Sequence, residues 1–569
     1  MHFVKAMTGT LVLAACAALV PSASAQTLQV LTAGSSAQFG PFAVAAYALA
    51  KSGGAKAFHY TVKASAPCPG STCYVALNDS RSSSIPQEPG NLWVVWSTNG
   101  IWAYLSVDST VGVRNFSAVP RSTLDLAALS ALPVSATTNY TYWSDGTNDT
   151  ALTSTVYSAL NHKALTAANT DIRPEDALFA TNRALNTLGY GTVADTRSGH
   201  SGQFLIGTSI KSFFTAADFA TPVSFAIAGG ADPFTGKVGP TEITLPIGAA
   251  PIIFVASTAT GSTTANASNL TTANAASLFS GSGKCAASLV TGATGPVSAV
   301  LREALSGTMN TAEWSVFVPG GASQETGVNP KAAGGNPLDV NCGSGSRFRA
   351  VGTGDEVNNV ASHASTVGYA FFSYESVGGG KTDRYLTYNN HDPIYSESHA
   401  YNGVLPTCPV VNGSYSCPIA NGASFPNLRD GAYTAWSVYR MITDSAGQAK
   451  AAALVAKAQA LVNDNIPDFV PFTPVCGVTK GAGNDPGLAL YREHFVPSTI
   501  TTIPDSVSIT ANDGGRGPTV TCSVNRQTLP SLTLGGGSEE GGDVGGGIEG
   551  PFTASNLPGL PGHTQGSTH

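Results

Sequence analysis

The sequence predicts an α/β fold in which mostly parallel sheets are covered by helices. Short, continuously apolar segments at 27–33, 251–256 and 367–374 have the length and composition of buried strands. Ala-rich segments at 42–51 and 446–462 are typical of helices. A chain of 569 residues is too long for one compact core, which indicates two or three folded units. Strands that alternate with helices in this way favour a parallel α/β architecture.

The stretch at about 57–165 fits this alternation poorly because it is rich in β-forming residues, Ser and Thr. Two apolar runs at 92–96 and 101–105 flank Asn99 and Gly100, which is the pattern of a β-hairpin. We therefore expect a β-rich insertion here. A helix is expected at 176–188, whereas the apolar segment at 432–442 remains without an assigned element.

The charge content limits the classes of partner. Charged residues make up 11% of the chain, against roughly 25% in an average soluble protein. The formal net charge is −7 and no basic run occurs, which argues against binding to nucleic acid. Ser, Thr, Asn and Gly must provide most of the solvation, a composition that is common in exported proteins.

The N-terminus has the pattern of a secretory signal peptide over 1–25. A short basic start precedes an apolar stretch at 6–20, which is too short to cross a bilayer as a stable anchor. A small-x-small pattern at 23–25 then predicts cleavage before Gln26. An alternative remains open, because the residues up to Cys16 resemble a lipoprotein processing site. Either route places the protein in the periplasm or outside the cell.

The cysteine count supports export. The chain has nine cysteines, and eight remain after the signal peptide is removed. An even number in an exported chain predicts disulfides. The simplest pairing joins neighbours first and leaves the remainder to pair in order: Cys68 with Cys73, Cys408 with Cys417, Cys285 with Cys342, and Cys476 with Cys522. No cysteine or histidine spacing suggests a zinc site, and no metal or cofactor is expected.

Two segments have the composition of an anion-binding site. Gly34, Ser35 and Ser36 separate the first strand from the first helix, and residues 306–308 (Ser-Gly-Thr) open another helix. The first backbone N–H groups of a helix have no partner inside it, glycine permits a close approach, and hydroxyls add donors. Arg302, four residues before the second segment, supplies a planar donor that suits an oxyanion. Taken singly, either segment is also what an ordinary helix cap requires.

Several segments, taken in order along the chain, resemble the phosphate-binding proteins of phosphate ABC transporters. These proteins belong to the type II superfamily of periplasmic binding proteins. Residues 32–36 are similar to the family's first glycine-serine loop, and 302–308 to its Arg-x-x-x-Ser-Gly-Thr motif, with Trp314 on the helix that follows. Residues 367–371 resemble its Ile-Gly-Tyr strand. Two further matches are an Asp-containing turn at 170–174 and an apolar crossing segment at 246–255. The resemblance covers about 26–55 and 165–470, with long insertions.

The resemblance implies a two-lobed fold and a set of ligand-binding residues. Ser36 and the backbone of Ala37, in the loop that includes Ser35, would donate to an anion from the first lobe. Asp171 would accept a hydrogen bond from a protonated oxyanion. From the second lobe, the ligand would be held by Arg302, Ser306, Gly307 and Thr308. No catalytic residue is implied. From the residues alone, Asp171 is equally well explained as a helix cap or as a partner of Arg173.

The sequence departs from the family pattern in two places. The family has Asp-Gly directly before Ser-Gly-Thr, whereas this chain has Ala304 and Leu305, so Glu303 is the remaining candidate for a carboxylate that supports Arg302. The second serine-rich loop of the family has no secure match. Residues 82–84, or Asp79 with Arg81, are candidates for it.

The expected organisation follows from the resemblance. Residues 26–256 would form the first part of lobe 1 with the β-rich insertion, 257–420 would form lobe 2, and 421–532 would return to lobe 1. The Gly-rich tail at 533–569 has the composition of a disordered segment. The expected ligand is inorganic phosphate or a related oxyanion. The expected protein partner is a membrane permease of the ABC type, and the chain is expected to be a monomer.

Two other classes of function remain open. A secreted phosphatase-like hydrolase could use His391, Asp392 and His399, although the sequence has neither a Gly-x-Ser-x-Gly nor a His-Glu-x-x-His motif. A surface or adhesive protein on a binding-protein scaffold would suit the low charge and the Gly-rich tail.

Overall fold

The computed structural model describes 26–60, 76–78, 90–118, 120–127, 129, 150–172, 242–281, 285–302, 306–317, 320–321, 347–350, 352–373, 383–395, 400–404, 410–411, 414–415, 425–429, 432–464 and 468–471. The expected signal peptide, the helix at 176–188 and the Gly-rich tail at 533–569 lie outside these residues. No helix among the described residues has the length and apolar character needed to cross a membrane.

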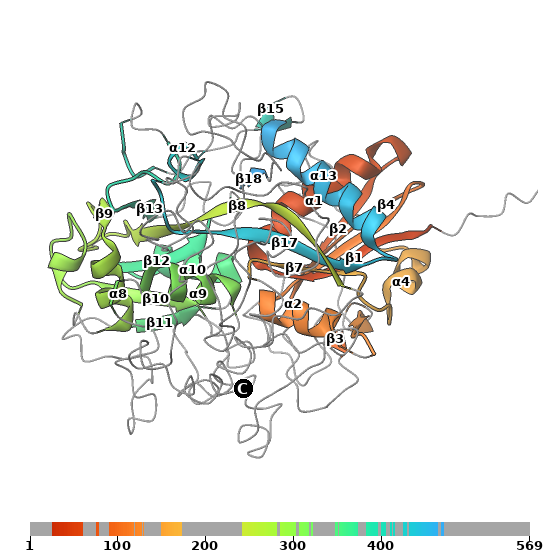
Figure 1. Cartoon of the computed structure of the whole chain (residues 1–569), viewed down its shortest axis with the longest axis horizontal. Coiled ribbons are helices and arrows are strands. Elements are labelled where there is room, and N and C mark those ends of the chain that lie inside the picture. The colour runs from red at the N-terminus through yellow and green to blue at the C-terminus, as the bar shows by residue number, and fades with distance from the viewer. Residues whose placement is uncertain are drawn as a thin grey trace, which may run out of the picture.

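One large sheet organises the described part of the chain (Figure 1). It has twelve strands, ten of which follow one another in the order β11-β10-β12-β8-β17-β7-β1-β5-β4-β2, while β13 and β18 pair with β8 beside this path. In chain order the strands are β1 (Leu28–Gly34), β2 (Lys56–Tyr60), β4 (Asn91–Ser97), β5 (Gly100–Ser106), β7 (Ala167–Thr170), β8 (Glu242–Ser257), β10 (Ser298–Arg302), β11 (Arg347–Ala350), β12 (Thr366–Phe371), β13 (Asp383–Tyr385), β17 (Trp436–Asp444) and β18 (Val470–Pro471).

The pairing directions divide this sheet into two lobes. In lobe 1, β7, β1 and β5 are parallel neighbours, and in lobe 2, β11, β10 and β12 are parallel neighbours. The long strand β8 connects them, because its first part pairs with β17 and its second part pairs with β12, both antiparallel. The expected two-lobed α/β fold is confirmed. The sheet is mixed rather than mostly parallel, because β8 and β17 run in opposite directions at the junction of the two lobes.

Helices cover both faces of the lobe 1 strands (Figure 1). Helix α1 (Phe39–Ala50) packs against α13 (Gln448–Asp464) on one face, and α2 (Ser109–Phe116) contacts β1 and β7 on the other. The side chains of β1 alternate accordingly, so that Val30 belongs to the core cluster under α1 and Leu31 to the cluster under α2. Because both faces are covered, the strands are apolar at nearly every position.

Lobe 2 is built in the same way around its shorter strands. Its helices are α8 (Thr272–Ser280), α9 (Gly307–Ala312), which continues as the π-helical segment η7 (Glu313–Phe317), and α10 (Gly352–Ser362). The remaining elements are small: η1 (Ser36–Gln38), η2 (Lys51–Gly53), β3 (Ala76–Asn78), β6 (Thr123–Asp125), α4 (Ser154–Leu160), β9 (Asn269–Leu270), η6 (Ala287–Leu289), β14 (Thr387–Tyr388), β15 (Val410–Val411), β16 (Ser414–Tyr415) and α12 (Pro426–Arg429).

The range at about 57–165 differs from the expected insertion. The hairpin is present, with its turn at Thr98 and Asn99, but its two strands are β4 and β5 of the central sheet. Strand β5 is a parallel neighbour of β1, and the same range contributes the helices α2 and α4. The physical reason is that both faces of this hairpin are buried under helices, so it extends the core of lobe 1 instead of forming a separate β unit.

The described residues include one of the eight cysteines expected to form disulfides. Cys285 is disulfide-bonded and buried, and its carbonyl accepts from the backbone N–H of Val297, directly before β10, at 3.0 Å. The other seven cysteines lie outside the described residues, so the pairing given above stays a prediction.

Candidate functional site

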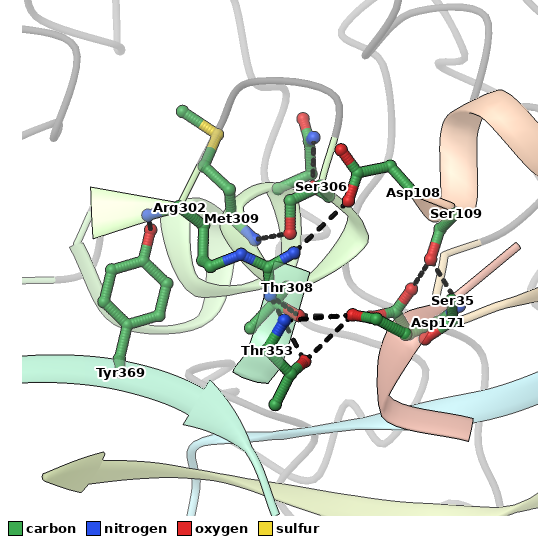
Figure 2. Close-up of polar contacts among 12 residues, drawn as sticks. Ser35, Asp108, Ser109, Asp171, Arg302, Ser306, Thr308, Met309, Thr353 and Tyr369 are labelled. Carbon is green, nitrogen blue, oxygen red and sulfur yellow. Dashed lines mark hydrogen bonds and ion pairs between the residues drawn. The ribbon is translucent and has the colours of Figure 1, made fainter. Parts of the chain in front are cut away.

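The candidate site lies between the two lobes, at the carboxyl ends of five strands. Three of these strands belong to lobe 1 and two to lobe 2. In lobe 1, β1 leads to Ser36, β5 to Asp108 and β7 to Asp171. In lobe 2, β10 ends at Arg302, and β11 is followed closely by Thr353. In sheets with parallel strands, ligands bind outside these carboxyl ends, where successive loops converge. Figure 2 shows most of these side chains pointing toward one another.

The turn after β1 contacts both lobes. Gly34 has φ 141°, a conformation that favours glycine, and an added Cβ there would meet the backbone of Asn169. Ser35 is buried, and its backbone is fixed within lobe 1, since its N–H donates to Asn169 O at 2.9 Å and its carbonyl accepts from Tyr104 Oη at 2.6 Å. The Ser36 hydroxyl instead accepts from the backbone N–H of Thr353 at 3.1 Å. Ser35 is therefore held within lobe 1, whereas the side chain of Ser36 is hydrogen-bonded to lobe 2. Ala37, whose backbone was expected to donate to the anion, is buried in η1.

The start of α2 supplies two residues that sequence analysis missed. Asp108 occupies the N-cap position of α2, but its side chain makes no capping hydrogen bond. Its Oδ1 accepts instead from Arg302 Nη2 at 3.2 Å. The hydroxyl of Ser109 donates to Oδ1 of Asp171 and accepts from the Asp171 backbone N–H at 3.4 Å. The start of this helix thus contacts both charged residues that the resemblance had singled out.

Asp171 is buried at the centre of the group. Its Oδ2 accepts from the hydroxyl of Thr308, in lobe 2, at 3.4 Å, and its backbone carbonyl accepts from Ser437 Oγ at 2.8 Å. Burial raises the pKa of Asp171 from 3.8 to about 7, even though Arg302, hydrogen bonds and Arg440 act in the opposite direction. Near neutral pH this carboxyl can therefore gain or give a proton.

Arg302 is buried, and its guanidinium is surrounded by polar groups from both lobes (Figure 2). Nη1 donates to the hydroxyls of Thr308 at 3.2 Å and Thr353 at 3.4 Å, and Nη2 donates to Asp108. The backbone N–H of Arg302 donates to Tyr369 Oη at 3.3 Å, which fixes the end of β10. An arginine held in this way presents a planar set of donors with little freedom left to lose.

The expected Ser-Gly-Thr segment opens α9. Ser306 is the N-cap, and its hydroxyl accepts from the Met309 N–H at 3.2 Å, so its side chain serves the helix. Gly307 lies directly against the carboxyl group of Asp171 and the hydroxyl of Ser109, both of which an added Cβ would meet. Thr308 contacts both Arg302 and Asp171. The motif therefore combines an ordinary cap with a close approach between the lobes.

The sequence lacks the family's Asp-Gly pair before Ser306 and a secure second serine-rich loop, and the structure provides polar groups from other residues instead. The carboxylate that pairs with Arg302 is Asp108, from the other lobe, while Glu303 lies outside the described residues. Asp108 and Ser109 lie directly after β5, at a place that was not considered for the second serine-rich loop. The earlier candidates for it, 82–84 and Asp79 with Arg81, lie outside the described residues. Thr353 was also missed, although Gly352 and Thr353 directly after a strand are a signal for a helix start.

The histidine-containing loop considered for a hydrolase is organised differently. The Asp392 carboxylate accepts from Tyr385 Oη at 2.9 Å and from the backbone N–H groups of Ile394 and Tyr395 at 2.8 and 3.0 Å. These contacts fix the loop, and His399 lies outside the described residues. Among the residues that the structure describes, no group of three or more His, Cys, Asp and Glu side chains could hold a metal ion.

No protein-family model matches the sequence, and no curated protein matches it. Among solved structures, similarity extends to an ABC-type phosphate transport receptor from Vibrio cholerae, with 13% identity, a TM-score of 0.24, and coverage of 40% of this chain and 72% of the receptor. A phosphate-binding protein from Stenotrophomonas maltophilia has 12% identity and a TM-score of 0.28, with coverage of 63% and 77%. The high-affinity periplasmic phosphate-binding protein PfluDING has 12% identity and a TM-score of 0.27, with coverage of 76% and 92%. Similarity at this level does not establish what the chain binds.

Proposed function

We propose that this chain is an exported solute-binding protein that captures phosphate or a similar oxyanion between its two lobes. The observation that carries the proposal is the buried guanidinium of Arg302, which is surrounded by hydroxyls and carboxyl groups from both lobes. These side chains partner one another between the lobes, and an oxyanion can accept hydrogen bonds from a guanidinium and several hydroxyls together.

Because the pKa of Asp171 is raised to about 7, its ionised form predominates only above that pH, and this form favours a ligand that carries a proton. A carboxylate beside a divalent anion is repulsive unless one proton lies between them. Hydrogen phosphate brings such a proton near neutral pH, whereas sulfate does not. The same position would favour arsenate over sulfate, because hydrogen arsenate also carries a proton.

Closure of the lobes provides the binding step. Ser36, Asp108 and Asp171 approach from lobe 1, and Arg302, Thr308 and Thr353 approach from lobe 2. An anion that contacts both sets would hold the lobes together, and the closed form would then be recognised by a permease of the ABC type. No covalent step is needed for this function, and none is proposed.

Titration calorimetry with phosphate, arsenate and sulfate tests the proposal on the wild type and on Arg302→Ala. We expect saturable phosphate binding by the wild type and a loss of at least about a hundredfold in the variant, because a charge-assisted contact is removed from a buried site. A wild type that binds none of the three anions would overturn the proposal. Release of inorganic phosphate from phosphate esters by the purified protein would favour a hydrolase instead.

A further inference from the structure

A buried amide side chain joins two of the turns that lobe 1 contributes to the candidate site. Gln38 occupies the N-cap position of α1, two residues after Ser36, yet its side chain makes no hydrogen bond that caps the helix. Its Nε2 donates instead to the carbonyl oxygen of Thr170 at 2.9 Å, and Thr170 directly precedes Asp171. The Gln38 side chain therefore connects the turn after β1 with the turn after β7.

The same amide belongs to a chain of buried hydrogen bonds. The hydroxyl of Thr32 donates to Asn169 Oδ1 at 2.7 Å, and Asn169 Nδ2 donates to Gln38 Oε1 at 2.8 Å. These three residues and Thr170 are all fully buried. A carbonyl oxygen can only accept, so the Thr170 carbonyl requires the NH2 group of Gln38 to face it, and this requirement fixes the orientation of both amides. A buried network in which each side chain finds its partners holds the backbone around it in one arrangement.

The backbone also connects the two turns, one residue earlier. The N–H of Ser35 donates to the carbonyl of Asn169 at 2.9 Å, and the parallel register between β1 and β7 stops at Asn169. Gln38 reaches the carbonyl of the next residue, Thr170, which lies beyond this register. The side chain thus extends the connection to the residue that immediately precedes Asp171.

We propose that Gln38 is a positioning residue for oxyanion capture, because it keeps the turn at Ser36 and the carboxyl group of Asp171 at a fixed separation. The inference rests on the proposed function and adds to it a residue that does not contact the ligand. Both turns would meet the same anion from lobe 1, so an arrangement that is fixed before binding reduces the entropy lost when the ligand enters. Without this link, the ligand itself would have to order the two turns.

The central variant is Gln38→Met, which keeps the length of the side chain and removes both its donor and its acceptor. Phosphate affinity is measured by titration calorimetry, and stability by denaturant unfolding. We expect phosphate affinity to fall by at least about tenfold, the size of roughly one or two lost hydrogen bonds. The variant should also unfold at a lower denaturant concentration, because the Thr170 carbonyl and the Asn169 amide lose their partner.

Asn427→Leu is the matched control for the loss of a buried amide. Asn427 is buried, and its Nδ2 donates to the carbonyls of Asp392 at 2.9 Å and Tyr395 at 3.2 Å. This side chain joins two segments in the same way as Gln38 does, but neither segment contributes a residue to the candidate site. The control should lose stability to a comparable extent and keep its phosphate affinity within about twofold of the wild type.

Gln38→Glu distinguishes positioning from general damage to the core, and it carries the test if Gln38→Met does not fold. The carboxylate keeps an acceptor for Asn169 but cannot donate to Thr170, whereas the protonated form can do both. Burial favours the protonated form, so it should predominate at mildly acidic pH. We expect phosphate affinity at least about tenfold below the wild type at about pH 8.5 and within about threefold of it at about pH 5.5.

Other groups near the two turns are charged or can titrate in both proteins. Asp171 interacts electrostatically with Arg302, on β10, and with Arg440, on β17. It also interacts with the phenols of Tyr104, on β5, and Tyr439, on β17. The wild type has the same groups, so the affinity of Gln38→Glu is compared with that of the wild type at each pH.

The outcomes separate this inference from the proposed function. Equal losses of affinity in Gln38→Met and Asn427→Leu overturn the positioning role, since any loss of stability would then weaken binding. An affinity of Gln38→Glu that stays equally far below the wild type at both pH values overturns it as well, because donation to Thr170 would not matter. Unchanged affinity in Gln38→Met overturns the inference alone, whereas a wild type that binds no phosphate overturns the proposed function and the inference with it.

Discussion

The backbone N–H of Thr353 donates a hydrogen bond of 3.1 Å to the hydroxyl of Ser36, and the hydroxyls of the two residues also lie 3.1 Å apart. Ser36 belongs to the turn after β1 in lobe 1, and Thr353 lies at the start of α10 in lobe 2. Two loops that are 317 residues apart in the sequence therefore meet through a single serine side chain. This contact therefore joins lobe 1 to lobe 2.

Replacement of Ser36 by alanine should weaken closure more than folding. The hydrogen bond from Thr353 N–H is lost, and a net contribution of about 1 kcal/mol per bond corresponds to roughly a fivefold loss of phosphate affinity in calorimetry. Thermal stability should change little, because the turn stays fixed by the backbone of Ser35. The control is Ser52→Ala, whose exposed hydroxyl only accepts from Asn99. Unchanged affinity in Ser36→Ala would contradict the prediction.

Asp171→Asn should stabilise the protein against unfolding at high pH. The pKa of Asp171 is raised to about 7 by burial, so between about pH 4 and pH 7 the folded protein binds more protons at this group than the unfolded chain does. Stability contributed by this group therefore falls as the pH rises through that window. Asparagine resembles the protonated carboxyl group, and it should raise the unfolding free energy by up to about 4 kcal/mol above pH 7.

The Asp171→Asn prediction is checked by denaturant unfolding of both proteins from about pH 4 to pH 8. The stability difference should be largest at the alkaline end and become small at the acidic end, where the folded carboxyl group is protonated and the unfolded one is about half protonated. A difference that stays constant across the whole range would show that Asp171 does not titrate between these limits.

Gly307→Ala should prevent the lobes from closing. The added methyl group would meet the Asp171 carboxyl group and the Ser109 hydroxyl, both in the opposite lobe. Alanine favours the helix itself, so lobe 2 should still fold, while phosphate affinity should fall by at least about tenfold.

A matched control for this substitution is Gly320→Ala, in which the methyl group would meet Thr272 and Ala276 within lobe 2. It should lower the thermal unfolding temperature without a comparable loss of phosphate affinity. Equal losses of affinity in both variants would indicate that Gly307 matters for folding and not for closure.

Asn169→Ala should destabilise lobe 1. The Asn169 side chain accepts from Thr32 Oγ1 at 2.7 Å and donates to Gln38 Oε1 at 2.8 Å, and all three residues are buried. The substitution leaves two buried polar groups without their partner, which costs about 2–4 kcal/mol in denaturant unfolding. Asn99→Ala, in which the lost side chain is exposed, should cost less than about 1 kcal/mol. Similar costs for the two variants would contradict the prediction.

The strands and helices with long apolar runs could be predicted from the sequence alone. The segments at 27–33 and 367–374 overlap β1 and β12, the segment at 251–256 lies in β8, and the Ala-rich segments at 42–51 and 446–462 overlap α1 and α13. In each case the run is continuous because helices bury both faces of the sheet, or because alanine favours helix directly. These signals are local, so they can be recognised without knowledge of the partner strands.

The arrangement of the strands could not be predicted, because it depends on pairing between distant segments. Strand β17 pairs along its whole length with β8. The stretch of chain between the two strands is roughly as long as a whole domain, so no local pattern indicates this pairing. The hairpin of β4 and β5 was recognised, but its parallel pairing with β1 was not. Without that pairing, the range around the hairpin was interpreted as a β-rich insertion in lobe 1 rather than as part of its central sheet.

Sequence analysis singled out Ser36, Asp171, Arg302 and Thr308, which the structure places together, but it missed Thr353 and the contribution of α2. Asp108 and Ser109 carry a local signal, since Asp followed by Ser between a strand and a helix is typical of a helix start. What the sequence does not indicate is that Asp108 reaches Arg302, a residue 194 positions further along the chain. Such contacts depend on how the two lobes meet.

A crystal structure grown with phosphate tests most directly the claim that an oxyanion binds between the lobes. We predict density for one phosphate within about 3 Å of the Arg302 guanidinium, with further contacts from the Ser36 or Ser109 side of lobe 1 and with one of its oxygens beside Asp171. Phosphate bound at saturating concentration to one lobe only, or at another place on the molecule, would contradict the claim.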